Sequence, residues 1–135
     1  MMVLVDTSVW SLAFRRTQDP VVAAATELAE LIREGRAGLI GPVRQELLSG
    51  IKREQQFAQL RERLRFFKDV LVETRDFELA AEFYNKCRSK GIQGANTDFL
   101  ISAMAARRGL PILTTDADFS SFAKVIPIRL HALRT

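Results

Sequence analysis

Short apolar runs alternate with longer amphipathic segments along the whole chain of 135 residues, and this alternation restricts the folds open to it. Five runs are rich in Val, Ile and Leu, as is typical of the buried strands of a parallel sheet. These runs are Val3–Val5, Leu39–Ile40, Val70–Val72, Ile112–Leu113 and Val125–Ile126. Strands that alternate with helices predict an α/β fold with a mostly parallel sheet and helices on both faces.

The segments between these runs carry helix signals. Asp19-Pro20 is typical of an N-cap followed by proline in the first turn, and Gly35 is expected to end that helix. Apolar residues at three- and four-residue spacings predict an amphipathic helix from Lys52 to Phe67. Asp76 is expected to cap a further helix that Gly91 stops.

One more predicted helix opens at Asn96 or Thr97 and is stopped by Gly109 and Pro111. The stretch Phe99–Ala106 is apolar nearly all round, so this helix is expected at the centre of the molecule.

Composition narrows the class of protein. The length and a hydrophobic content of 47% predict one globular domain over residues 1–135. No apolar run approaches the roughly 18 residues of a membrane span, and no signal peptide is visible, so a cytoplasmic protein without a membrane partner is expected. One cysteine, Cys87, and one histidine, His131, cannot build a Cys/His zinc site, and a Ser–His–Asp triad would depend on His131 alone. Any enzyme chemistry is therefore expected to use carboxylates.

The net charge of +4 is concentrated in one stretch of the chain. Between Arg44 and Lys68 stand seven basic and three acidic residues, which accounts for the whole excess. A basic band beside an acidic site suits a polyanion such as RNA. The alternative is a solvated helix face with partners one turn away.

Four acidic residues stand beside apolar segments, where an unpaired charge is costly. Asp6 and Asp116 follow predicted strands, whereas Glu46 and Asp98 are expected to start helices. Because ligands gather at the carboxyl ends of parallel strands, all four acids are expected at the same edge of the sheet. Each one alone has a structural alternative as a helix cap or a first-turn residue.

Such a cluster would suit Mg²⁺ or Mn²⁺, which prefer oxygen ligands. The ion would lower the pKa of a bound water and stabilise charge on a phosphate. Ser8 and Thr114 are placed to hydrogen-bond a ligand carboxylate and fix its rotamer.

Four motifs in order, VDTSVW, GPVRQELLSG, TDFLISAMAARRG and PILTTDADF, resemble those of a PIN domain, specifically the VapC toxins of bacterial and archaeal toxin–antitoxin pairs. The resemblance extends from Val3 to about Ile128. It implies a PIN-like fold with a central, mostly parallel five-stranded sheet between helices. It also implies an endoribonuclease that uses Mg²⁺ or Mn²⁺ to hydrolyse RNA phosphodiester bonds.

By motif position, the resemblance implies the site residues. The implied catalytic residues are Asp6, Glu46, Asp98 and Asp116, of which Asp6, Asp98 and Asp116 would bind the metal. The implied supporting residues are Ser8, Thr114 and Asp118, although capping of the helix into Phe119 explains Asp118 equally well. The chain departs from the family at the turn Gln93–Asn96 and at Phe99, and neither change removes a ligand.

The resemblance further implies a homodimer and a VapB-like antitoxin whose C-terminal segment lies across the active-site groove. The groove candidates are Trp10, Phe14, Leu48 and Ile51, with Trp10 and Phe14 expected to form an exposed apolar ridge. The candidates for contact with RNA phosphate are Arg15, Arg16, Arg44, Lys52 and Arg53.

Alternative functions fit the sequence to different degrees. A PIN-fold nuclease of RNA processing without a toxin role, or a PIN-fold binding module without catalysis, would share the fold. A phospho-acceptor signalling domain needs adjacent acids after its first strand, where Asp6 stands alone. A haloacid-dehalogenase-like phosphatase needs the pattern D-x-D there, and Ser8 occupies the second position.

Overall fold

A parallel three-stranded sheet forms the centre of the computed structural model, which describes residues 1–14 and 23–134. The strands are β1 (Val3–Val5), β2 (Ala37–Gly38) and β3 (Ile112–Leu113), in the order β2-β1-β3. Two of these strands coincide with predicted runs, whereas β2 begins two residues before the predicted one. All three strands run in one direction, as the alternation of strands and helices predicted.

The prediction of five strands is wrong for the described part of the chain. At the two edges of the sheet, pairing is reduced to single bridges. Leu39, just after β2, pairs with Asp69 on one side, and Ile112 of β3 pairs with Leu130 on the other. Val70–Val72 follows the first bridge without forming a strand. The amides of Val125–Ile126 turn back to the carbonyl of Phe122, which prevents pairing with the sheet there.

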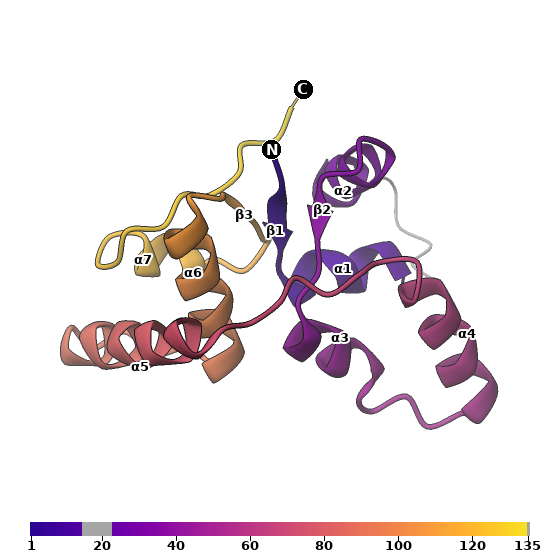
Figure 1. The fold of residues 1–135 in the computed structure, drawn as a ribbon, viewed down its shortest axis with the longest axis horizontal. Helices are drawn as coiled ribbons and strands as arrows, with labels where there is room; N and C mark the ends of the chain where they lie inside the picture. Colours follow the sequence, from indigo (N-terminus) through magenta and orange to yellow (C-terminus); the bar gives the residue numbers. More distant parts are fainter. Residues whose placement is uncertain (15–22, 135) are drawn as a thin grey trace.

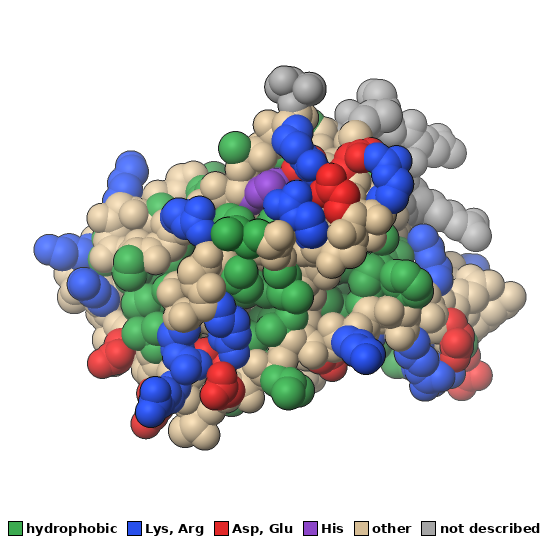
Figure 2. All heavy atoms as spheres, turned by 45° about the horizontal axis from the view of Figure 1, so that its top comes forward, with side chains coloured by type: hydrophobic (Ala, Val, Ile, Leu, Met, Phe, Trp, Pro, Cys, Tyr) green, Lys and Arg blue, Asp and Glu red, His purple; other side chains and the backbone are tan. Residues whose placement is uncertain are grey.

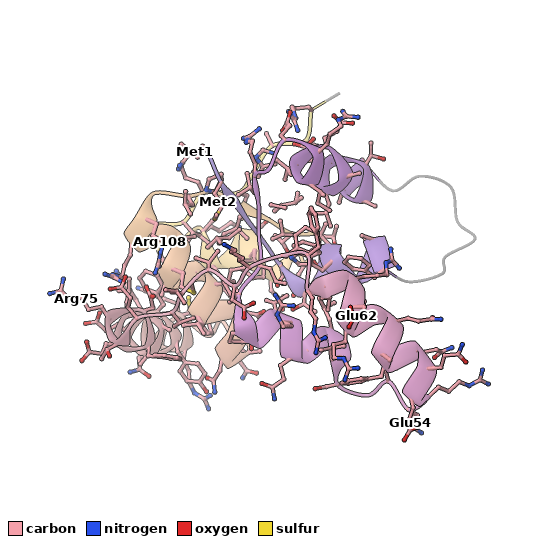
Figure 3. All side chains as sticks on the ribbon, turned by 45° about the vertical axis from the view of Figure 1, so that its right-hand side comes forward. Met1, Met2, Glu54, Glu62, Arg75 and Arg108 are labelled. Atoms are coloured by element: carbon pink, nitrogen blue, oxygen red, sulfur yellow. The ribbon has the colours of Figure 1, made fainter. Side chains whose placement is uncertain are left out.

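Helices occupy both sides of this sheet, with α1 and α2 on one side and α6 and α7 on the other (Figure 1). The described helices are α1 (Thr7–Phe14), α2 (Ala23–Arg33), α3 (Gly41–Leu48), α4 (Glu54–Leu64), α5 (Thr74–Ser89), α6 (Asn96–Arg108) and α7 (Asp118–Phe122). α5 packs on α6, whereas α4 projects from the rest of the molecule, with Glu54 at its outer end (Figure 3). Among the described residues, no helix combines the length and apolar character needed to cross a membrane.

Most helix ends follow the sequence signals, and Asp76 is a correction. Asp76 does not precede its helix as an N-cap; it is the third residue of α5, and its Oδ2 accepts the amide of Glu73 at 2.8 Å. Gly109 ends α6 with φ +64°, a left-handed conformation that glycine adopts without strain. The predicted cap Asp19-Pro20 lies outside the described residues.

The core confirms the central position of α6. Its residues Phe99 to Ala105 are all buried, including Ser102, whose hydroxyl donates to the carbonyl of Asp98 at 2.7 Å. Because α6 is enclosed on nearly all sides, the position of its first turn is fixed, and that turn carries Asp98.

Two buried carboxylates that lie away from the carboxyl ends of the strands form ion pairs between distant segments of the chain. Asp76 is fully buried, and Arg107 and Arg108 donate to it at 2.7 and 2.9 Å. Burial alone would raise its pKa, but the hydrogen bonds from Arg108, the Glu73 amide and Arg107 outweigh burial and lower the pKa to about 2.

Glu27 of α2 is the second buried carboxylate, and it holds the C-terminal segment. It pairs with His131 and accepts two 3.0 Å hydrogen bonds from Arg134, which also binds Glu34. Burial raises the pKa of Glu27. Its hydrogen bonds to His131 and Arg134 lower the pKa by more than burial raises it, so the net shift is downward. Figure 2 shows this group of acidic and basic side chains around the single histidine. Both chain ends lie at this end of the molecule, opposite the carboxyl ends of the strands (Figure 1).

Candidate active site

A cavity of about 630 Å³ opens at the carboxyl ends of the strands. It is lined by Asp6, Thr7, Ser8, Pro42, Gln45, Glu46, Ser49, Thr97, Asp98 and Asp116. The fold therefore brings the four predicted acids to one hollow, although they are separated by up to 110 positions in the chain. Parallel strands and the helices that follow them converge at this edge, which is the physical reason for the gathering.

Asp6 is the most enclosed of the four acids, with only 4% of its surface exposed. It directly follows β1, and its amide donates to the carbonyl of Leu113 at 2.9 Å, so its backbone continues the sheet pairing. The hydroxyls of Ser8 and Thr114 both donate to its Oδ2, at 2.8 and 2.9 Å. These hydroxyls fix the carboxylate rotamer in the way predicted for Ser8 and Thr114.

Asp98 is the third residue of α6, and its Oδ2 accepts the amide of Ala95 at 3.0 Å. This hydrogen bond satisfies a free amide at the helix start, so the structural alternative foreseen for Asp98 is real as well. Burial raises the pKa of Asp98 to about 6, and the negative charges of Asp6, Asp116 and Glu46 add to the rise. Burial is therefore the main cause of the raised pKa of Asp98, and the charges of the other three acids are a smaller one.

Glu46 reaches the cavity from a different position in its helix than predicted. It was expected to start a helix, but it is the sixth residue of α3, which begins at Gly41. Its side chain is exposed, and its Oε1 accepts a 2.6 Å hydrogen bond from the hydroxyl of Thr7. Glu46 therefore comes to the cavity from the last turn of α3.

Asp116 stands in the turn between β3 and α7. Its amide donates to the hydroxyl of Thr114 at 3.0 Å, and its Oδ1 accepts the amide of Asp118 at 2.9 Å. Asp118 is exposed at the start of α7 and is absent from the cavity lining. The arrangement places Asp116 rather than Asp118 with the other acids.

The four carboxylates share one hydrogen-bonding arrangement. In each, one oxygen accepts an internal hydrogen bond, and the other oxygen has no donor among the described residues. Within residues 1–14 and 23–134, no three acidic, His or Cys side chains stand close enough to hold one ion directly. A hard cation that keeps several waters still fits this donor set, because Mg²⁺ is usually bound through one or two carboxylates together with water and substrate phosphate.

The predicted RNA-contacting residues divide into three groups. Lys52 and Arg53 are exposed just before α4. The guanidinium of Arg44 donates hydrogen bonds to Asp69 at 2.9 Å and to the backbone carbonyls of Leu64, in α4, and Phe67, after it. Its donors are engaged in the fold. Arg44, a predicted candidate for contact with RNA phosphate, therefore uses its guanidinium within the fold. Arg15 and Arg16 lie outside the described residues.

The exposed ridge predicted for Trp10 and Phe14 is also wrong. Trp10 is fully buried and packs edge-on against Phe67, with ring centroids 4.9 Å apart. Phe14 stacks on Trp10 and, with Ile51, lines a groove of about 790 Å³ along α4. Leu48 is half-buried outside this groove.

Several cavity residues were missed by reasoning from the sequence. Thr7, Gln45 and Ser49 line the hollow, and each stands one to three positions from a predicted acid. Their proximity in the chain to a predicted acid was the only sequence signal for these residues. The sequence could not report the contact of Thr7 with Glu46, because the two residues are 39 positions apart.

Sequence comparison agrees with the fold. A family model described as the PIN domain matches residues 3–125, and the chain therefore belongs to the PIN-domain family. Within that family it is of the VapC type. It is 32% identical to the VapC ribonuclease Mb1587 of Mycobacterium bovis and to ribonuclease VapC11 of Mycobacterium tuberculosis. Each alignment spans 138 residues, 98% of this chain and all of the relative.

Solved structures share the architecture at lower sequence identity. FitAcB from Neisseria gonorrhoeae matches with a TM-score of 0.74 and 23% identity, over 96% of this chain and 97% of that chain. VapBC2 from Rickettsia felis, bound to a DNA fragment from its promoter, matches with a TM-score of 0.76 and 19% identity, over 97% and 98%. These similarities confirm the PIN-like α/β fold.

Proposed function

We propose that this chain is an endoribonuclease that depends on Mg²⁺ or Mn²⁺ and acts as the toxin of a VapBC-like toxin–antitoxin system. The cavity in which four carboxylates each keep one oxygen free of described donors carries this proposal. The names of the relatives, which are ribonucleases, support it. Phosphodiester hydrolysis needs an activated water and stabilisation of charge on the phosphate, and a divalent ion held by carboxylates supplies both.

Asp6, Asp98 and Asp116 are the residues that would hold the ion, some directly and the rest through waters that the ion keeps, since the three do not stand close enough to bind it together. Ser8 and Thr114 hold Asp6 by Oδ2, which leaves Oδ1 for binding. The backbone holds Asp98 by Oδ2 and Asp116 by Oδ1, which leaves one oxygen on each for the same purpose. Since these anchors are in place before a ligand arrives, little reorganisation is needed when one binds.

Glu46 has a separate role in the proposal. It lines the cavity from α3, and its Oε1 is already engaged by Thr7. Its Oε2 is the atom that would accept a proton from the attacking water, as a general base.

RNA is the proposed substrate. Lys52 and Arg53 stand at the exposed start of α4, three or four residues after Ser49 of the cavity rim. Their positive charge would hold phosphates beside the acidic centre. Arg15 and Arg16 remain predictions.

A VapB-like antitoxin is the proposed partner, since solved structures similar to this chain include VapBC and other toxin–antitoxin complexes. The groove along α4 supports this proposal, because apolar side chains of Phe14, Ile51 and Leu60 line it. Arg63 lies over the Phe14 ring at 4.6 Å, which adds a positive charge at its edge. An amphipathic segment with an acidic flank would fit such a groove.

A homodimer is the remaining part of the proposal. Phe77 of α5 is 57% exposed and borders a hollow of about 440 Å³ that is also lined by Tyr84, Phe99 and Leu100. A second copy of the chain would cover this apolar surface. The hollow lies beside the acid cavity, because Pro42 lines both. Light scattering of wild type and Phe77→Asp tests it, with loss of the dimer expected in the variant. The expected cytoplasmic location stays a prediction.

Cleavage of a structured RNA pool tests the enzymatic part. We expect cleavage by wild type with Mg²⁺ or Mn²⁺, none with EDTA, and none by Asp6→Asn or Asp98→Asn. Glu82→Gln is the matched control, because this acid is exposed on α5 and lies outside the cavity lining, and it should cleave like wild type. Cleavage that survives in both aspartate variants would reject the site. Cleavage by none of the proteins would favour the binding module without catalysis.

Expression in cells separates toxicity from RNA processing. Growth arrest by wild type, and not by Asp98→Asn, is the expected result of a toxin. An active nuclease that leaves growth unchanged would instead favour the RNA-processing alternative.

A further inference from the structure

Glu46 is anchored differently from the other carboxylates of the cavity. Asp98 and Asp116 are held by backbone amides, and Asp6 is held mainly by two hydroxyls. Glu46 has one anchor among the described residues, the hydroxyl of Thr7, which donates to Oε1 at 2.6 Å. This anchor can be removed by substitution without touching any of the four acids.

Glu46 depends on such an anchor more than the aspartates do. Its side chain is exposed, has one more rotatable bond than aspartate, and starts from the last turn of a helix of eight residues. Without a partner, a glutamate in this position would sample several rotamers, and only some would direct Oε2 into the cavity.

Thr7 itself is rigidly placed. It is the first residue of α1 and directly follows Asp6, whose amide is bonded to Leu113 in the sheet and whose carbonyl accepts the amide of Val9 at 3.1 Å. Threonine is branched at Cβ, which restricts its rotamers further. The position of its hydroxyl is therefore set by the same strand end that sets Asp6.

We propose that Thr7 is a positioning residue that holds Glu46 in the orientation needed for proton transfer. This inference rests on the proposed ribonuclease function. It ties the general base on α3 to the strand end that carries the metal ligands, through a contact between residues 39 positions apart.

Thr7→Val tests the inference, because valine keeps the branched shape and removes only the donor. Supporting groups of this kind usually contribute 10- to 100-fold, so we expect kcat to fall by about that factor. KM for RNA should change by less than about threefold, since Thr7 is not proposed to bind RNA. Thr7→Ser restores the hydroxyl and should return most of the activity.

Mn²⁺ binding, followed by the EPR signal of the free ion, gives a readout that does not depend on catalysis. Affinity should stay within about threefold of wild type in Thr7→Val, because the proposed metal ligands keep their own anchors. A large loss of Mn²⁺ affinity would overturn the inference by showing that Thr7 supports the metal site in general.

A double-mutant cycle with Glu46→Gln, measured in single turnovers, completes the test. If Thr7 acts through Glu46, adding Thr7→Val to Glu46→Gln should reduce the rate by less than about threefold. A full additional loss, or a wild-type kcat in Thr7→Val alone, would overturn the inference. A wild type that cleaves no RNA with any metal would reject the proposed function, and the inference with it.

Discussion

Replacing Asp98 by asparagine should make the protein more stable when metal is absent. Asp98 has a pKa of about 6 in the folded chain against 3.8 as its ordinary value. At about 1.36 kcal/mol for each pKa unit, this shift corresponds to a penalty of about 3 kcal/mol on the charged form. Because Asp98 is partly exposed, solvent screening reduces the expected penalty to roughly 1–2 kcal/mol.

The sign of the pH dependence follows from proton binding. Between about pH 4 and about pH 6 the folded chain holds a proton on Asp98 that the unfolded chain has lost. The stability contributed by Asp98 is therefore greatest below pH 4, falls as pH rises, and is constant above the folded pKa. Asparagine lacks this charge and still offers an oxygen to the amide of Ala95.

Urea unfolding in EDTA from pH 4 to pH 8 is the assay. Near pH 4 the two proteins should differ little, whereas at pH 7 Asp98→Asn should be more stable by roughly 1–2 kcal/mol, or about 3–8 °C in Tm. Added Mg²⁺ should stabilise wild type and not the variant, because only wild type keeps the full ligand set. A variant that is less stable than wild type at pH 7, or a difference that does not vary with pH, would refute this reasoning.

Three further predictions concern other parts of the molecule. Asp76→Asn should lower the free energy of unfolding by about 3 kcal/mol in urea titrations, because it leaves two arginines at a buried site without their carboxylate; a change below 1 kcal/mol would contradict this. Replacing Lys52 and Arg53 by glutamine should reduce the slope of log K against log salt for RNA binding by about 0.7–0.9 per lost phosphate contact, whereas the exposed Lys124→Gln should leave the slope unchanged. Glu27→Gln should weaken the contact of α2 with the C-terminal segment, so the amides of that segment should exchange with solvent at least about tenfold faster. Unchanged protection would show that the segment is held by backbone pairing alone.

Much of the fold could be predicted because its signals are local. Runs of branched apolar residues marked β1 and β3, and the apolar stretch Phe99–Ala106 marked α6 as the central helix. The outer strands could not be predicted in this way. An apolar run such as Val70–Val72 has the composition of a strand, but in the fold the pairing at this edge is limited to the bridge between Leu39 and Asp69.

The surface assignments failed for the same reason. Trp10 and Arg44 carry the side chains typical of a binding surface, and both are used inside the molecule. Phe67 packs against Trp10 from more than 50 positions away, and its carbonyl also accepts a hydrogen bond from Arg44. No periodicity in the sequence reports such a contact.

The sequence by itself determined which chemistry is available. It supplied four acids beside apolar segments, one cysteine and one histidine, and strand ends that must meet if the sheet is parallel. The tertiary structure alone decided the geometry. It brought Glu46 in from the end of α3 and joined it to Thr7, raised the pKa of Asp98, and left Asp118 outside the cavity. The sequence specifies the type of each residue, but the distances between side chains and their burial arise only when distant segments pack against one another.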